Sequence, residues 1–200
     1  MIESEREKLF NRDSAYLSIG ITEGGINRSM IGVPWKMTAH AYTMRTPDVY
    51  ISAEDLNDEA VMEKILEYKV VGCYIFTPLR DYGFLNRFKE IEDISIRCAE
   101  NLKNLDFLKG LERCSMLFLQ NAKLQNLDML FDIKEYSQSI LGCFTCVGLY
   151  NCEIEDLSRF EREEYRFSEF LIWNPKSRNE RERFKVVSAR KFVYHEYDEH

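Results

Sequence analysis

The cysteines are the side chains in this sequence best suited to metal or redox chemistry, but their spacing supports neither. Cys143 and Cys146 form a single C-x-x-C motif. A structural zinc site normally has four ligands, and no second pair with matching spacing lies nearby. A redox site places such a motif at a helix N-terminus, where the dipole lowers the thiol pKa, whereas this motif leads into a predicted strand. We therefore interpret both cysteines as structural, and we expect no metal and no cofactor.

The histidines give no recognisable catalytic arrangement either. His195 and His200 could hold a metal together with Asp198, but polar residues of this kind more often form a solvated tail. His40 has no G-x-S-x-G nucleophile turn to act on. The chain also lacks the glycine-rich loops that bind nucleotide phosphates. We accordingly predict a protein that is not an enzyme, with an unrecognised catalytic site as the remaining alternative.

Composition narrows the choice of partner and compartment. The chain has 200 residues, of which 45% are hydrophobic, and a formal net charge of −7. A negative chain is a poor match for nucleic acid, which needs a concentrated basic face. No apolar run reaches the roughly 18 residues of a transmembrane helix, and the charged first residues do not resemble a signal peptide. Because six cysteines without a leader suggest free thiols in a reducing compartment, we predict a cytoplasmic location with no membrane partner.

A repeat over residues 91–160 organises the rest of the chain. Each copy begins with apolar residues at strand spacing and ends with an apolar triplet spaced by three, which suits a helix or 3₁₀ segment packed back onto the strand. Repeats of this length are typical of stacked architectures. The copies read Ile91-x2-Ile94-x-Ile96-x2-Ala99 with Leu102, Leu105 and Leu108; Cys114-x2-Leu117-x-Leu119-x2-Ala122 with Leu124, Leu127 and Leu130; and Phe144-x2-Val147-x-Leu149-x2-Cys152 with Ile154, Leu157 and Phe160.

This pattern resembles the leucine-rich repeat family. Residues 114–124 and 144–154 match L-x-x-L-x-L-x-x-[N/C/A]-x-L, with Ala122 and Cys152 in the position usually held by asparagine or cysteine. The resemblance covers roughly residues 70–175. It implies an α/β leucine-rich-repeat-like solenoid with a parallel sheet on its concave face and helical or 3₁₀ segments on its convex face. Since no copy has asparagine in that position, the usual side-chain support of the turn is expected to be missing. The other interpretation is an ordinary α/β domain whose leucines align by coincidence.

The flanking segments fit divergent caps on such an array. Residues 1–47 are predicted to be an N-terminal cap or cover segment, and residues 48–200 the array with its C-terminal cap, together one compact unit. A helix capped by Asp55 or Asn57 is predicted to run to about Tyr68. Further strands are predicted at residues 15–22, 48–53, 70–76, 167–173 and 184–188, with a tail strand at 192–194.

The repeat register also predicts which side chains face away from the core, because alternate residues of a strand point to opposite faces. Several of these positions carry aromatic or large apolar residues, and an exposed patch of this kind usually marks an interaction surface. We therefore predict a non-catalytic protein–protein interaction module that binds a partner of unknown identity through an aromatic-rich concave sheet surface. The predicted partner-binding residues are Tyr74, Phe76, Arg97, Met116, Phe118, Gln120, Tyr150, Leu171 and Trp173.

Two alternatives for this surface stay open. It could be the interface of a homodimer, which would make the protein a self-associating structural one. It could also be covered by the N-terminal segment of the same chain, which is rich in Trp35, Met37, Tyr42 and Met44.

Overall fold

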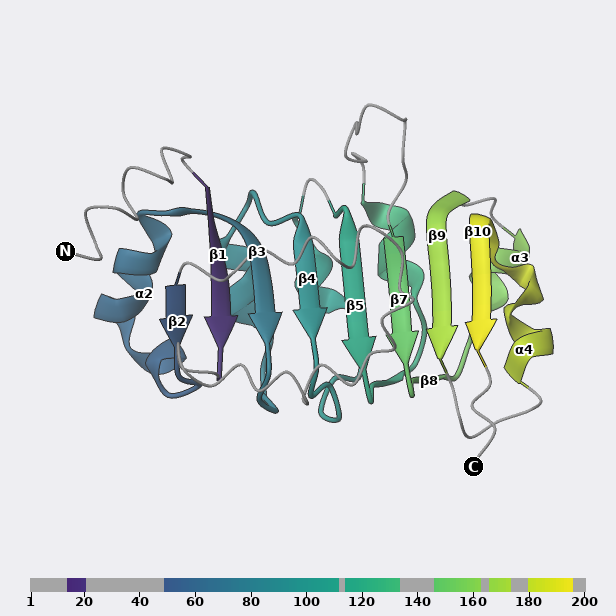
Figure 1. The fold of residues 1–200 in the computed structure, drawn as a ribbon, viewed down its shortest axis with the longest axis horizontal. Coiled ribbons are helices and arrows are strands. Elements are labelled where there is room, and N and C mark those ends of the chain that lie inside the picture. Colours follow the sequence, from purple (N-terminus) through teal and green to yellow (C-terminus); the bar gives the residue numbers. More distant parts are fainter. Residues whose placement is uncertain are drawn as a thin grey trace.

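The structure is a computed structural model that describes residues 14–20, 49–111, 114–133, 146–162, 166–173 and 180–195. Its centre is an eight-stranded sheet in the order β10-β9-β7-β5-β4-β3-β1-β2, and all pairings between these strands are parallel (Figure 1). The α/β class and the parallel sheet are therefore confirmed. The strands are β1 (Ser14–Ile19), β2 (Val49–Ile51), β3 (Lys69–Ile75), β4 (Asp93–Ile96), β5 (Met116–Gln120), β7 (Cys146–Tyr150), β9 (Arg166–Trp173) and β10 (Ser188–His195).

The order of the strands follows the chain except at the N-terminal end. From β3 to β10 each strand of the sheet pairs with the next, as stacked repeats require. Strand β1, which belongs to the predicted N-terminal cap, lies inside the sheet between β3 and β2. The sheet is open and is not curled, so the curvature expected of a solenoid stays a prediction.

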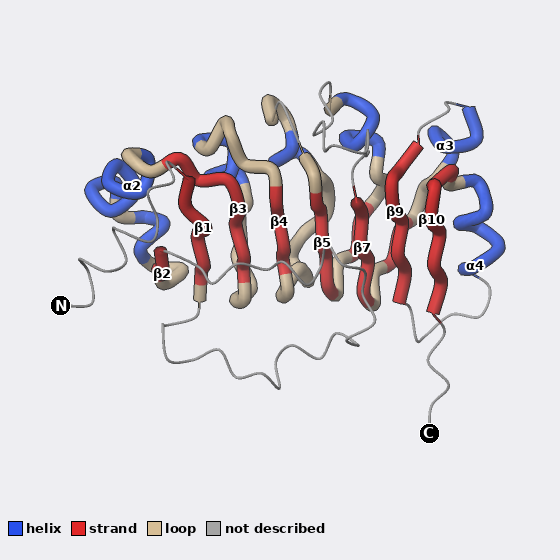
Figure 2. Tube along the Cα trace, turned by 45° about the horizontal axis from the view of Figure 1, so that its top comes forward, coloured by secondary structure: helices blue, strands red, loops and turns tan. Residues whose placement is uncertain are grey.

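Short helical segments follow the strands and bury their apolar residues against one face of the sheet (Figure 2). We call this the core face. A second, two-stranded parallel sheet joins β6 (Lys123–Leu124) to β8 (Glu153–Ile154). The helical segments are η3 (Asp55–Asn57), α2 (Glu59–Leu66), η4 (Gly83–Arg87), η5 (Asp106–Leu108), η6 (Asp128–Asp132), α3 (Ser158–Arg162), α4 (Glu180–Arg183) and η7 (Phe184–Val186).

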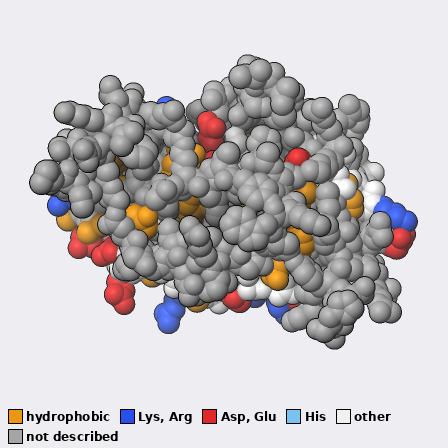
Figure 3. All heavy atoms as spheres, in the orientation of Figure 1, with side chains coloured by type: hydrophobic (Ala, Val, Ile, Leu, Met, Phe, Trp, Pro, Cys, Tyr) orange, Lys and Arg blue, Asp and Glu red, His pale blue; other side chains and the backbone are white. Residues whose placement is uncertain are grey.

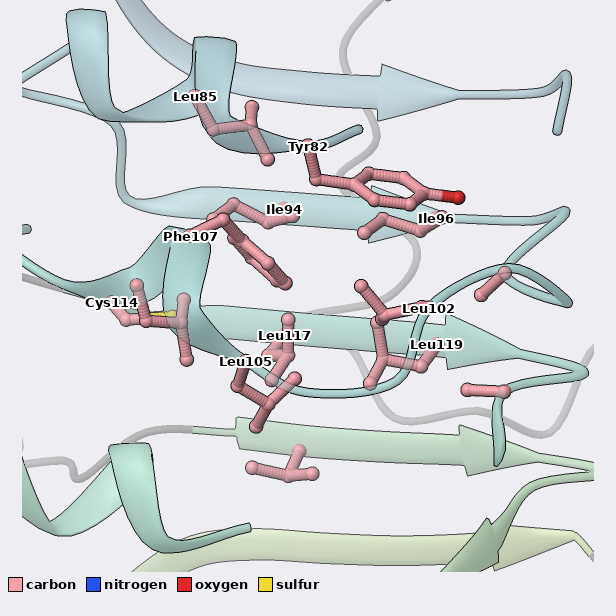
Figure 4. Packing of buried hydrophobic residues seen from close by; sticks show 14 of the residues in the cluster. Tyr82, Leu85, Ile94, Ile96, Leu102, Leu105, Phe107, Cys114, Leu117 and Leu119 are labelled. Carbon is pink, nitrogen blue, oxygen red and sulfur yellow. The ribbon is translucent and has the colours of Figure 1, made fainter. Parts of the chain in front are cut away.

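The predicted inward positions of the repeat form the core. Ile94 and Leu117 are direct neighbours on β4 and β5, and both are fully buried. Leu105 and Phe107, from the connection that follows β4, pack against them (Figure 4). No single strand and helical segment could bury these residues alone, so each repeat depends on the next for its core.

Cysteines occupy this core as free thiols. Cys73, Cys114 and Cys152 are buried, and all five cysteines in the described part of the chain are free. Burial raises the pKa of the Cys73 and Cys114 thiols well above the ordinary value. Both behave as small hydrophobic residues, as the sequence predicts.

Side chains support the turns that follow β5 and β7. The Cys152 thiol, in the family's asparagine or cysteine position, donates to the Leu119 carbonyl oxygen at 3.4 Å. The preceding residue adds an asparagine pair, because Asn151 Nδ2 donates to Asn121 Oδ1 at 2.7 Å. Both asparagines have positive φ, 64° for Asn121 and 50° for Asn151, a conformation that asparagine tolerates better than most residues. The usual asparagine is absent from the family's position, as expected, and the Cys152 thiol and the preceding asparagines support the turn instead.

Two local predictions also need correction. Asp58, and neither Asp55 nor Asn57, caps the helix, because its carboxylate accepts from the Ala60 and Val61 N–H groups. Asp55 is instead engaged with Ser52, whose N–H donates to it at 2.7 Å. The strand predicted at 184–188 is 3₁₀ segment η7, and the last strand is the longer β10. Most of the predicted cap, residues 1–13 and 21–47, lies outside the described residues.

Candidate partner-binding face

The face of the sheet opposite the core face carries the predicted binding residues, and we call it the front face. Its middle row crosses the strands as direct Cα partners in the predicted register. Figure 3 views the molecule from this side and shows hydrophobic side chains of described residues near the middle, with charged ones towards the margins. The middle row consists of Ser18, Tyr74, Ser95, Phe118, Gly148 and Leu171.

The predicted residues share this face but differ in exposure. Four of them are buried: Tyr74, Phe118, Leu171 and Trp173 are between 2% and 4% exposed. The prediction that these four are exposed was therefore wrong. Phe118, Leu171 and Trp173 form a second hydrophobic cluster, with Cys146 and Tyr150 packed against it, so each side chain shields the next. The other five predicted residues form a half-buried rim: Phe76, Arg97, Met116, Gln120 and Tyr150.

Tyr16 organises the end of the front face near β1. Its ring stacks on Tyr74 with centroids 5.8 Å apart, and its hydroxyl donates to Asp93 Oδ2 at 3.3 Å. The ring lies over Gly72, where an added Cβ would come within 2.5 Å of it. Because Gly72 has no side chain, the Tyr16 ring can lie against the sheet at this position. Tyr16 and Asp93 were not among the predicted site residues, although the strand register would have placed Asp93 here.

Arg97 is the cation of the rim. Its guanidinium carbon lies 4.3 Å from the centre of the Phe118 ring, a cation–π geometry. Burial lowers the pKa of Arg97 to about 10. The side chain therefore stays charged at neutral pH in a poorly hydrated position beside an aromatic ring.

Two buried hydroxyl groups lie in the middle row. Ser18 and Ser95 are 0% and 1% exposed, and neither Oγ atom has a hydrogen-bond partner among the described residues. Buried hydroxyl groups usually have such a partner, since desolvating one without compensation costs about 1–3 kcal/mol. Solvent is thus excluded from small polar positions of the row as well as from the aromatic ones.

The carboxyl ends of the strands carry a polar ladder that sequence reasoning missed. Asn121 lies between two partners, because it accepts from Asn151 and donates to Glu100 Oε1 at 3.2 Å. The signal was present in the sequence as asparagine one position before Ala122 and Cys152 in two copies. This ladder fixes the turns that end the strands, and with them the direction of the rim side chains.

The described residues contain no cluster of three or more His, Cys, Asp or Glu side chains that could hold a metal ion. Cys146 is a half-buried cysteine of the front face that forms no disulfide, while Cys143, His40, Asp198 and His200 lie outside the described residues. The helices in the described part of the chain are all too short or too polar to cross a membrane.

Comparison of the chain with protein-family models, with curated proteins and with solved structures found no match.

Proposed function

We propose that this protein is a non-catalytic recognition module, a leucine-rich-repeat-like solenoid that binds a protein partner through the front face of its sheet. The proposal rests on one observation: the buried aromatic and apolar residues of the front face are surrounded by a half-buried rim that combines apolar, polar and charged side chains. Protein interfaces combine aromatic and arginine anchors with polar groups in this way. The rim residues Phe76, Arg97, Met116, Gln120 and Tyr150 keep part of their surface in solvent and are in reach of a partner.

The repeat supports the solenoid part of the proposal. Strands β3 to β10 of the sheet are neighbours in chain order, and short helical segments follow at matching places. In the leucine-rich repeat family this arrangement forms a curved array that presents its sheet to proteins. The solenoid is part of what we propose, although the sheet itself is open and not curled.

Arg97 is the residue that we expect to orient the partner. A fully hydrated arginine loses much of its interaction with water on binding, and this cost offsets the gain from a new ion pair. Arg97 is already largely desolvated against Phe118, so that part of the cost is met on folding. We therefore propose that the partner places a carboxylate or a backbone carbonyl against this guanidinium.

Tyr150→Ser in the rim tests the proposal, with Tyr68→Ser as a matched control. Tyr68 is 56% exposed and follows α2, away from the front face, so the same change there should leave binding intact. Tagged full-length chains are used as bait in a lysate of the native host, and retained proteins are quantified by mass spectrometry. A protein retained by the wild type and by Tyr68→Ser should be retained roughly tenfold less by Tyr150→Ser, as for an interface anchor.

Circular dichroism and urea unfolding of both variants must show native-like folds for the comparison to count. Equal retention by the two variants would contradict a binding role for the rim.

A further inference from the structure

Backbone hydrogen bonds also join the repeats outside the main sheet, along β6 and β8. We call this row the β6–β8 ladder, and it comprises residues 103, 122–125 and 153–156. In it, N–H groups of one copy donate to carbonyl oxygens of the preceding copy. The Glu155 N–H donates to the Leu124 carbonyl oxygen at 3.0 Å, and the Asp156 N–H donates to the Gln125 carbonyl oxygen at 2.8 Å. The carbonyl groups of one copy are thus bonded by the copy that follows it.

The last copy of this ladder contains Ile154 and Glu155. Leu124 and Ile154 are direct Cα partners, so Ile154 and Glu155 occupy the positions that Leu124 and Gln125 hold one copy earlier. Their carbonyl oxygens are the ones to which a further copy would donate. At both positions the donor is a side chain instead. Arg183 Nη2 donates to the Ile154 carbonyl oxygen at 2.7 Å and to the Glu155 carbonyl oxygen at 2.8 Å.

A guanidinium group is well suited to replace two backbone N–H groups. Arginine stays charged in proteins, and its N–H donors are fixed in one plane. Nη2 carries two of these hydrogen atoms, one for each carbonyl oxygen. Hydrogen bonds from a charged donor are shorter and stronger than those between neutral groups. Both arginine bonds are indeed no longer than the backbone bonds at the equivalent positions one copy earlier.

The segment that contains Arg183 also closes the hydrophobic core. Arg183 is the last residue of α4, and Figure 1 shows α4 at the end of the sheet, beyond β10. The next residue, Phe184 of η7, is buried in the large hydrophobic cluster, as is Val187. One short segment therefore packs against the apolar end of the array and bonds the last carbonyl groups of the β6–β8 ladder.

We propose that Arg183 ends the array, because its guanidinium takes the place of the two backbone N–H groups that a further repeat would supply. Terminal repeats of stacked proteins must close an end that has no neighbour. Since Arg183 bonds β8 while Phe184 packs in the core, the ladder and the last segment are coupled, and opening of either removes support from the other. This inference goes beyond the proposed function and does not depend on it, because the front face takes no part in it.

Hydrogen–deuterium exchange of the full-length, purified chain, followed at single amides by NMR, tests the inference. Arg183→Met keeps much of the length of the side chain and removes its donors. The ladder amides of Glu155 and Asp156 should then exchange roughly tenfold faster, because charge-assisted hydrogen bonds at the end of the ladder are lost. The Val187 amide, which donates to the Phe184 carbonyl oxygen at 3.0 Å in the last segment, should accelerate with them.

Arg162→Met is the matched control. Arg162 is an exposed arginine whose Nε donates to the Ser158 carbonyl oxygen of its own helix, and like Arg183 it carries its charge near the Asp156 carboxylate. The control should leave the exchange of the same amides unchanged. The Leu119 amide in β5 should keep its exchange rate in both variants. Arg183→Lys, which keeps the charge but lacks the planar group, should give rates between those of the wild type and Arg183→Met.

Any other result contradicts the inference. Unchanged exchange of the two ladder amides in Arg183→Met would show that the ladder does not need the guanidinium. Faster exchange of these amides without that of Val187 would show that the last segment is not coupled to the ladder. An equal effect of Arg162→Met would assign the change to lost charge, and equal acceleration in β5 would assign it to a general loss of stability.

Discussion

At the scale of single residues, small side chains beside large ones let the front face pack. Gly72 leaves room for the Tyr16 ring, and Gly148 lies between Phe118 and Leu171 in the middle row. A side chain at Gly72 would push on the Tyr16 ring, which already stacks on Tyr74. Gly72 is therefore part of the packing, because the missing side chain lets the Tyr16 ring lie close to the sheet.

Gly72→Ala should destabilise the protein by about 1–3 kcal/mol, the usual cost of overpacking. The new Cβ would meet the Tyr16 ring at 2.5 Å, and the ring cannot move without losing its stacking on Tyr74 and its hydrogen bond to Asp93. Urea unfolding measures the change. In a Tyr16→Ala background the same substitution should be close to neutral, and an equal cost in both backgrounds would rule out this clash as the cause.

At the scale of elements, an Asx turn begins each of four helical segments besides α2, where Asp58 accepts the same bond from the Ala60 N–H. In each case an Asp or Asn side chain accepts a hydrogen bond from the N–H two residues later, at 2.8 to 3.1 Å. Such turns are a common use of these residues. The signal recurs in the sequence at the spacing of the repeat, so it could have been read there. The four residues are Asp81, Asn104, Asn126 and Asp156.

Asp156 should make the stability of its turn depend on pH. Hydrogen bonds from the N–H and hydroxyl groups of Ser158 hold the pKa of the Asp156 carboxyl below its usual 3.8. Because the folded-state pKa is the lower one, the stabilisation is present above pH 3.8 and is lost as pH falls through the folded-state pKa. Asp156→Asn keeps an acceptor but has no charge to titrate.

Urea unfolding from pH 7 down to pH 2 measures this effect. The advantage of the wild type over Asp156→Asn should be constant above about pH 5 and should shrink below pH 4. A difference that does not change with pH would show that the charge of Asp156 contributes nothing.

At the scale of the whole molecule, the sheet is buried on both faces, as parallel sheets usually are. The core face is covered by short helical segments, and the middle row of the front face is equally withdrawn from solvent. The described residues thus form a large hydrophobic cluster on the core face and a smaller one on the front face.

The double variant Phe118→Glu with Trp173→Glu should therefore unfold the protein or strongly lower its stability, because it places two carboxylates where side chains are 4% and 2% exposed. Circular dichroism and the urea midpoint measure the result. Leu66→Glu with Tyr68→Glu adds the same charge at positions 37% and 56% exposed and should leave the fold intact. A folded monomer with an unchanged midpoint for the first variant would mean that the front face is free.

The local periodicity of the sequence was enough to predict the face of the sheet that most strand residues occupy and the pairing of neighbouring strands. The alternation of residues around Ile94 and Leu117 placed every second side chain on the correct face, and the repeat offset predicted which residues of neighbouring strands are partners. It also placed Cys114 and Cys152 in the core. These features depend on the period of a strand and on stacking of equivalent positions, and both can be read from a short stretch of sequence.

Only the tertiary structure decided where β1 lies and which front-face residues are buried. Strand β1 pairs with both β2 and β3, and this insertion has no counterpart in the repeat. Phe118 and Trp173 were predicted to be exposed because strand alternation shows only which face of the sheet a side chain points to. It does not show whether other residues cover that face. Exposure depends on contacts between residues far apart in the chain, and the repeat pattern carries no information about them.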